Sequence, residues 1–126
     1  MVVRVPRDVR WILGLQIAIL CYGGVVHIVQ LATGGWPPYA WAPGWLAAYF
    51  TALTLLDPLA AVLLWLRRRA GLFLSAFIFV TDAAANGYAV YGLGKAPALA
   101  VISQAVITAM AAGVLLTARR VRPWLR

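Results

Sequence analysis

The sequence is short of the residue types on which most catalytic and metal sites depend. It contains no glutamate, three aspartates, one histidine and one cysteine in 126 residues. The lone Cys21 cannot form an internal disulfide and lacks the partners of a metal site, so we expect a small packing residue. No phosphate-binding loop, magnesium-holding acid cluster or nucleophile–base pair is recognisable. We therefore expect no metal and no cofactor, and we exclude chemistry that ionises a diphosphate.

Apolar residues, in contrast, are in excess. They make up 64% of the chain, with a mean hydropathy of +0.88, against about 45–50% in soluble proteins. Four apolar stretches reach the length of about 20 residues that a helix needs to cross a bilayer. They run over about 11–32, 44–66, 71–93 and 97–118. The sequence has no recurring alternation of apolar and polar residues, so it does not indicate strands. The connections between the spans are short, which makes neighbouring helices antiparallel. We predict an all-α integral membrane protein, with residues 1–126 forming a single antiparallel bundle of four transmembrane helices.

The net charge of +8 would suggest nucleic acid in a soluble protein, but the placement of the charges argues against that partner. Ten of the eleven basic residues flank the same ends of the four spans, and the other two loops hold only Lys95. These ten are Arg4, Arg7, Arg10, Arg67, Arg68, Arg69, Arg119, Arg120, Arg122 and Arg126. The positive-inside rule then places both termini in the cytoplasm. We expect these arginines to contact anionic membrane lipid, and the first span to be a retained helix rather than a signal peptide.

Two aspartates lie near the middle of predicted spans, Asp57 in 44–66 and Asp82 in 71–93. An ionised carboxylate at that depth costs at least about 2.5–3.5 kcal/mol, so each must face the bundle interior or a wet cavity. Each carboxyl group either lines such a cavity or simply hydrogen-bonds the backbone or a neighbouring amide. Every span carries a polar stripe at helical spacing, and four stripes in a small bundle favour a common cavity. The stripes are Gln16, Gly23, His27 and Gln30; Phe50, Thr54 and Asp57; Ser75, Phe79, Asp82 and Asn86; and Gln104 and Thr108.

The predicted cavity extends from the bilayer centre towards the outer leaflet, where aromatic residues are frequent. The loop WPPYAWAPGW, residues 36–45, is either an interfacial aromatic belt or a lid over the cavity. His27 is either structural or a proton relay to the aspartates, and Pro58 frees the carbonyl of Thr54 beside Asp57. The candidate substrate-binding residues are Tyr22, His27, Trp36, Trp41, Tyr49, Phe50, Thr54, Phe79, Asn86 and Gln104.

Buried carboxyl groups of this kind suit acid catalysis. Two buried carboxyls that share one proton hold a neutral acid beside an anion, and a neutral acid in a dry cavity is a strong proton donor. In a membrane cavity the plentiful weak base is an alkene. Protonation of an alkene gives a carbocation, which aromatic faces stabilise. Asp57 and Asp82 are therefore the candidate catalytic residues.

The segments LLDPL (55–59) and FVTDAAANGY (79–88), together with the four spans and the aromatic loop, give the chain a family resemblance. It resembles the small bacterial membrane-bound terpene cyclases that act on prenylated substrates. A weaker resemblance is to the emopamil-binding, sterol-isomerase-like four-helix proteins, whose glutamate has no counterpart here. The resemblance implies a general acid at Asp57 or Asp82, a lipophilic prenylated substrate and a multi-pass protein of the bacterial cytoplasmic membrane. The DxDD-type motif of soluble class II cyclases is absent.

Two other functions remain open. Central acids with aromatic walls also suit a small proton-coupled multidrug-type transporter, although such transporters usually carry the key acid in the first span. A non-catalytic membrane subunit is the other alternative, with polar stripes that face a partner helix. An oligomer is possible in each case. An enzyme requires both acids to line one cavity within a single chain, whereas a subunit requires the stripes to diverge.

Overall fold

The computed structural model describes residues 3–94 and 97–126, and within these residues all regular secondary structure is helical. The helices are α1 (Arg7–Thr33), α2 (Gly44–Trp65), α3 (Arg69–Gly87) and α4 (Ala98–Val121). A π-helix, η1 (Tyr88–Leu93), continues α3, and a short 3₁₀ turn, η2 (Arg122–Trp124), continues α4. The predicted all-helical class is confirmed, and the π-helix was not foreseen. Lys95, the basic residue predicted in the loop before the fourth span, lies outside the described residues.

The described part of the chain contains four helical segments long and apolar enough to cross a membrane, in agreement with the predicted spans. Proline stands immediately before three of them: Pro6 before α1, Pro43 before α2 and Pro97 before α4. A helix start leaves its first N–H groups without intrahelical partners, so a residue that lacks an N–H loses nothing there. These prolines therefore mark where each helix begins.

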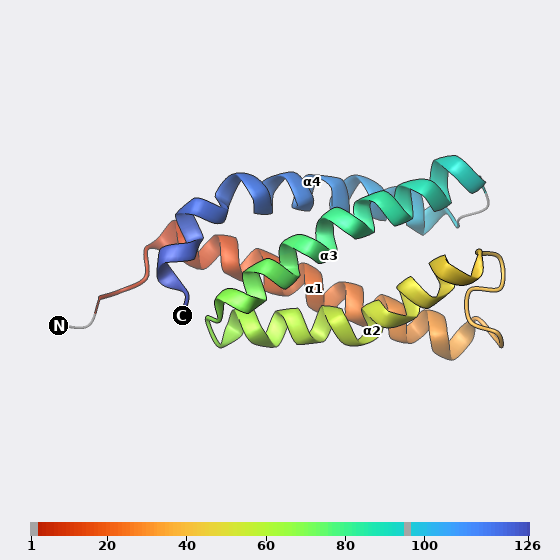
Figure 1. Ribbon diagram of the computed structural model, residues 1–126, viewed down its shortest axis with the longest axis horizontal. Coiled ribbons are helices and arrows are strands. Elements are labelled where there is room, and N and C mark those ends of the chain that lie inside the picture. Colours follow the sequence, from red (N-terminus) through yellow and green to blue (C-terminus); the bar gives the residue numbers. More distant parts are fainter. Residues whose placement is uncertain (1–2, 95–96) are drawn as a thin grey trace.

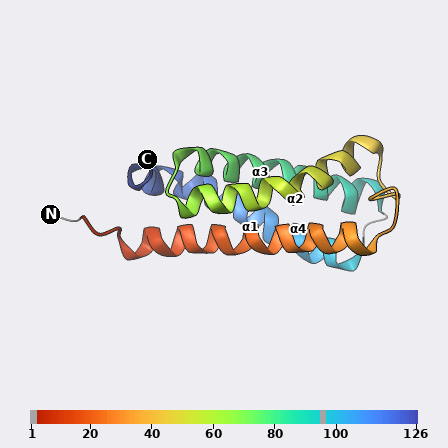
Figure 2. The ribbon, with the colours of Figure 1, turned by 90° about the horizontal axis from the view of Figure 1, so that it is seen from below.

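The four helices run antiparallel along one axis, as two perpendicular views show (Figures 1 and 2). Both termini lie at the same end of the bundle as the α2–α3 turn (Figure 1). Loop 34–43 and the end of η1 lie at the opposite end. The arginines therefore gather at one end among the described residues, and this end is called the arginine end below.

Helices α1 and α2 approach closely where glycines face the middle of α2. A Cβ atom added to Gly24 would lie 3.2 Å from Pro58 Cγ, and one added to Gly23 would lie 2.5 Å from Asp57 Oδ2. Pro58 lies inside α2, and the ribbon of α2 bends along its length (Figure 1), as expected where proline removes a helical hydrogen bond. The glycines therefore seat the bent part of α2, with Asp57, directly on α1.

The arginine end is closed by backbone pairing between the C-terminus and the α2–α3 turn. Arg69 N–H donates to Arg126 O and Arg126 N–H donates to Arg67 O, each at 2.7 Å. Arg67 has a positive φ of 55°, and the side chain of Leu125 is buried. This pairing fixes the end of α4 against the turn.

Helix α4 is also joined to α1 near the same end. Arg120 donates two hydrogen bonds to the Asp8 carboxylate, at 2.7 and 3.0 Å. Next to this ion pair, Val9 and Val121 are fully buried. From here towards the other end, α1 and α4 diverge (Figure 1).

A pair of glycine substitutions tests the close packing at the α2–α3 turn. A Cβ atom at Gly71 would lie 2.7 Å from the backbone nitrogen of Leu64, whereas one at Gly113 would meet nothing within 4 Å. We expect Gly71→Ala to lower the free energy of unfolding by about 1–3 kcal/mol, as overpacking does. Gly113→Ala should leave it unchanged or raise it by up to about 1 kcal/mol, since alanine favours helix. Thermal unfolding in detergent micelles, followed by circular dichroism, measures both. Equal midpoints for the two variants would contradict this packing.

Candidate functional site

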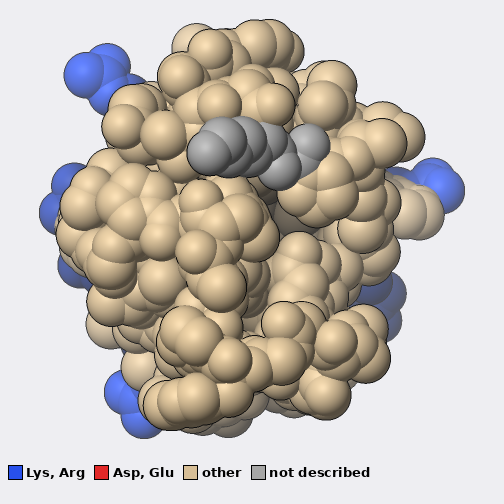
Figure 3. Space-filling view, turned by 90° about the vertical axis from the view of Figure 1, so that its right-hand side faces the viewer, with Lys and Arg blue, Asp and Glu red and all other residues tan. Residues whose placement is uncertain are grey.

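A cavity of about 540 Å³ occupies the half of the bundle away from the arginine end. All four helices and loop 34–43 contribute to its wall. Seen from this end, the visible surface shows no Asp or Glu among the described residues and is hollowed near its centre, and Lys and Arg appear only around the outline of the molecule (Figure 3). Eight of the predicted catalytic and substrate-binding residues line the cavity: Tyr22, His27, Trp41, Phe50, Asp57, Phe79, Asp82 and Asn86.

The two central aspartates both face this cavity rather than the exterior. Asp57 on α2 is 4% exposed and Asp82 on α3 is 9% exposed. The cavity wall contains no Lys or Arg among the residues described. Asp57 Oδ1 is buried and accepts no hydrogen bond from the described residues. The predicted convergence of the acids on one cavity is therefore what the structure shows. Among the described residues, the imidazole of His27 is the one basic group near Asp57, and no basic side chain pairs with Asp82.

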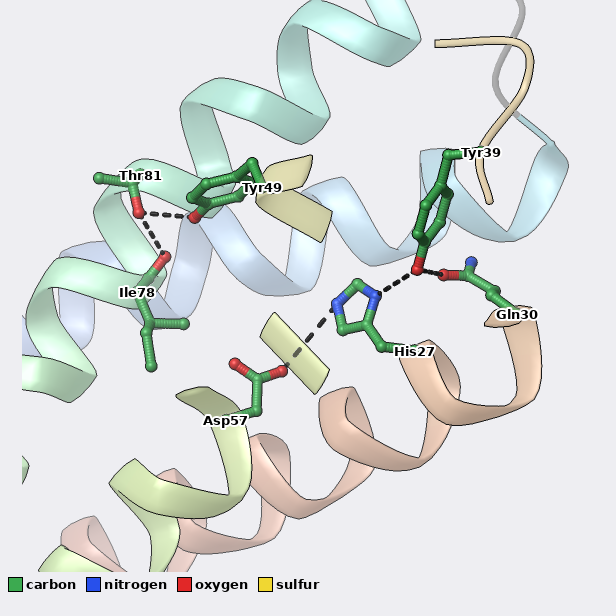
Figure 4. Close-up of polar contacts among 7 residues, drawn as sticks. All are labelled: His27, Gln30, Tyr39, Tyr49, Asp57, Ile78 and Thr81. Atoms are coloured by element: carbon green, nitrogen blue, oxygen red, sulfur yellow. Dashed lines mark hydrogen bonds and ion pairs between the residues drawn. The ribbon is translucent and has the colours of Figure 1, made fainter. Parts of the chain in front are cut away.

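His27 connects Asp57 to the loop through a row of polar groups (Figure 4). Its Nδ1 lies 3.1 Å from the Tyr39 hydroxyl, and that hydroxyl donates to Gln30 Oε1 at 2.9 Å. Because the single hydroxyl proton of Tyr39 goes to Gln30, the network assigns the imidazole proton to Nδ1. The free Nε2 then faces Asp57 Oδ2 at 4.0 Å, a separation too long for a direct hydrogen bond.

Phe50 is the centre of the aromatic wall. Its ring contacts His27, Tyr39, Trp41 and Tyr49, with centroid separations between 5.4 and 6.3 Å. The His27 ring is stacked on it, with an interplanar angle of 21°. Aromatic faces carry negative electrostatic potential, which attracts a cation held above them. The wall beside the acids is thus suited to a positively charged, poorly hydrated group.

Four predicted binding residues do not line the cavity. Trp36 is 90% exposed, and the Thr54 hydroxyl is buried without a hydrogen-bond partner among the described residues. The Tyr49 hydroxyl shares a hydrogen bond of 2.6 Å with Thr81. Gln104 accepts from Asn86 Nδ2 at 2.9 Å and donates to the carbonyl of Ala83 at 2.9 Å. Its polar group therefore joins α4 to α3 instead of facing the hollow.

Two polar residues of the predicted stripes, Gln16 and Ser75, lie nearer the arginine end than the cavity. Ser75 Oγ donates to Gln16 Oε1 at 3.0 Å, and both side chains are buried. They pack against each other across α1 and α3. Polar side chains of the stripes therefore also meet outside the cavity, and the cavity itself lies in the half that carries the acids.

Tyr39 lines the cavity but is not among the residues that the sequence predicts there. The sequence places it only within the aromatic loop, where no pattern distinguishes it from its neighbours. In the structure its ring folds back over the cavity, is largely buried and lies 5.4 Å from Phe50 between ring centroids. The loop is thus partly a lid, through Tyr39 and Trp41, and partly an exposed surface, through Trp36.

No family model matches the sequence, and no curated protein or solved structure matches it either. Among the described residues, no group of three or more His, Cys, Asp or Glu side chains comes together as a metal site.

The Tyr39 hydroxyl gives the lid a measurable pH dependence. Burial, with a smaller contribution from the charge of Asp82, raises the pKa of Tyr39 to about 12, whereas an unfolded tyrosine titrates near pH 10. The unfolded chain therefore releases this proton first. The contribution of the protonated Tyr39 hydroxyl to the free energy of unfolding should be present below about pH 10 and be lost as the pH rises towards about 12.

Tyr39→Phe isolates this contribution. The difference in tyrosinate ultraviolet absorbance between wild type and variant should titrate at about pH 12. Wild type should lose more stability than the variant above about pH 10, measured by thermal unfolding in micelles. A difference that titrates at the ordinary tyrosine pKa would place Tyr39 in water.

Proposed function

We propose that the chain is a membrane-embedded terpene cyclase or isomerase, which protonates an alkene of a lipophilic prenylated substrate in the cavity. The observation that carries the proposal is that two buried carboxyl groups and several aromatic side chains line the same cavity, with no Lys or Arg among the described residues of its lining. Such a site offers a proton donor, an anion and aromatic faces in one enclosed space. The resemblance of LLDPL and FVTDAAANGY to the small bacterial membrane-bound terpene cyclases supports the same conclusion.

The proposed reaction starts with proton transfer from a neutral carboxyl group to an alkene carbon. A C–H bond forms, the carboxylate remains, and the substrate becomes a carbocation. Phe50, Phe79 and Trp41 stabilise the cation by their electron-rich faces. A second alkene attacks the cation and closes a ring, or the cation rearranges. Loss of one proton to a carboxylate then restores the acid, so that substrate and product have equal mass.

His27 is suited to exchange a proton with Asp57. The hydrogen bonds through Tyr39 to Gln30 hold its proton on Nδ1 and leave the Nε2 lone pair towards Asp57. A base oriented by a third group is the arrangement that proton-transfer sites commonly use. We assign His27 the role of positioning and resetting the proton on Asp57, in preference to a purely structural role.

The transporter and subunit alternatives fit the geometry less well. The polar stripes converge within one chain, whereas a subunit would turn them towards a partner. A transporter needs access from both sides, but the Gln16–Ser75 contact and the buried side chains near the arginine end occupy the other half of the bundle.

We further propose that the four helices cross the bacterial cytoplasmic membrane with the arginine end in the cytoplasm. Ten arginines at one end and an uncharged described surface at the other support this orientation under the positive-inside rule.

The orientation has a direct test in fusions at residue 126. Green fluorescent protein fused there should fluoresce, and alkaline phosphatase fused there should be inactive, because the first folds in the cytoplasm and the second outside it. Fusions truncated after Thr33, at the end of α1, should give the opposite pattern. The reverse result in both positions would overturn the orientation.

The catalytic assignment is tested by replacing each carboxyl group by an amide. Membranes that contain the protein are incubated with farnesylated or geranylated small molecules, and conversion to a product of equal mass is followed by chromatography. A general acid contributes about 10²–10⁴-fold to a rate, so Asp57→Asn or Asp82→Asn should lower turnover by about 100-fold or more.

Asp8→Asn is the matched control, because Asp8 is the remaining acid, lies at the arginine end and is half exposed. It should turn over substrate at the wild-type rate. Circular dichroism shows whether each variant folds. Wild-type turnover in both central variants would remove the acid assignment, and loss of turnover in all three would point to a general effect of charge removal.

A further inference from the structure

We infer that the gap between α1 and α4 is a lateral portal, through which a prenyl chain passes from the membrane interior to the two acids. The inference rests on the proposed function, and it adds the route and the orientation of the substrate. It starts from the asymmetry of the bundle. The Asp8–Arg120 ion pair and the buried valines beside it join α1 and α4 at the arginine end. The two helices then spread where the cavity lies (Figure 1).

Exposure of the lining residues locates the opening. On α2 and α3, the lining side chains of Phe50, Asp57, Ile78, Phe79 and Asp82 are all buried, so these helices form closed walls. On the other side, Tyr22 of α1 is 54% exposed and Ile102 of α4 is 66% exposed, although both line the same cavity. A side chain that borders the hollow and the exterior at once marks a gap in the wall.

The cavity-lining residues on the two sides of this gap, called the lips below, are apolar. Tyr22 and Val26 lie on the α1 side, and Leu99, Ile102 and Val106 lie on the α4 side. Tyr22 and Ile102 lie inside helices that are long and apolar enough to span a membrane. The opening therefore faces hydrocarbon in the proposed orientation. The alternative route, from the loop end, is narrowed by Tyr39 and Trp41, whose rings pack near Phe50.

The portal also orients what enters. Asp57 and Asp82 belong to the walls formed by α2 and α3, and the lips belong to α1 and α4. An apolar chain that passes between the lips therefore meets the carboxyl groups on the far side of the cavity. A prenyl chain suits this arrangement because its alkenes can accept a proton from the acids, whereas a saturated phospholipid chain has no alkene to protonate. We therefore assign the portal to the prenyl chain, which enters before the rest of the substrate.

Bulky labels at single cysteines test the portal. In a Cys21→Ser background, Ile102→Cys and Leu116→Cys are each reacted with pyrene maleimide in micelles and returned to vesicles. Leu116 lies on the same helix, is 84% exposed and does not line the cavity, so it is the matched control. The label at position 102 should slow substrate association by about tenfold or more and raise KM, with kcat little changed. The label at position 116 should change neither.

A label at Ala40→Cys, in the loop, tests the other route. If this label raises KM and the label at position 102 does not, the substrate passes under the loop and the portal is wrong.

Saturable binding of a radiolabelled farnesylated indole to the Asp57→Asn variant provides a readout that needs no turnover. Block of this binding by the 102 label supports the portal even if no conversion is seen, in which case the proposed function alone fails. Retention of phospholipid that the farnesylated compound cannot displace would assign the gap to lipid and overturn the inference.

Discussion

The fold is organised around two buried carboxyl groups, with no Lys or Arg among the described residues that line the cavity beside them. Each ionised carboxylate inside a bilayer costs at least about 2.5–3.5 kcal/mol, a large fraction of the net stability of a small protein. The residues around the two acids accommodate them locally. Gly23 leaves room for the Asp57 carboxyl group, and the cavity gives both acids access to whatever ligand enters.

The two halves of the molecule differ in packing, because one half is closely packed and the other encloses the cavity. At the arginine end, the C-terminal pairing, the Asp8–Arg120 ion pair and the Gln16–Ser75 contact hold the helices together. The other half is hollow and aromatic. Rigid packing on one side thus positions side chains that surround empty space on the other, a division that binding sites between helices commonly show.

Helical periodicity predicted much of this arrangement and failed at identifiable places. Spacings of three and four residues correctly placed Phe50 with Asp57, and Phe79 with Asp82 and Asn86, on faces that turn inward. Periodicity reports which side of a helix is buried, but not whether the polar group there meets a cavity or another side chain. Gln104 is bound to Asn86, so its position on a stripe did not make it part of the wall. Tyr39 belongs to a loop, and its packing on Phe50 depends on the path of the loop backbone. A loop has no helical repeat from which the direction of a side chain could be predicted.

The π-helix that ends α3 gives this segment a tolerance to changes in its length. Hydrogen bonds from residue i to i+5 accommodate one residue more per turn than an α-helix would. Removal of one residue between Tyr88 and Leu93 would let the segment continue as an α-helix, and its end would face nearly the same way, because five α-helical residues turn about as far as six π-helical ones. A single-residue deletion here would therefore be absorbed by an exchange of the π turn for an α turn, whereas the same deletion inside an α-helix would rotate everything after it by about 100° about the axis.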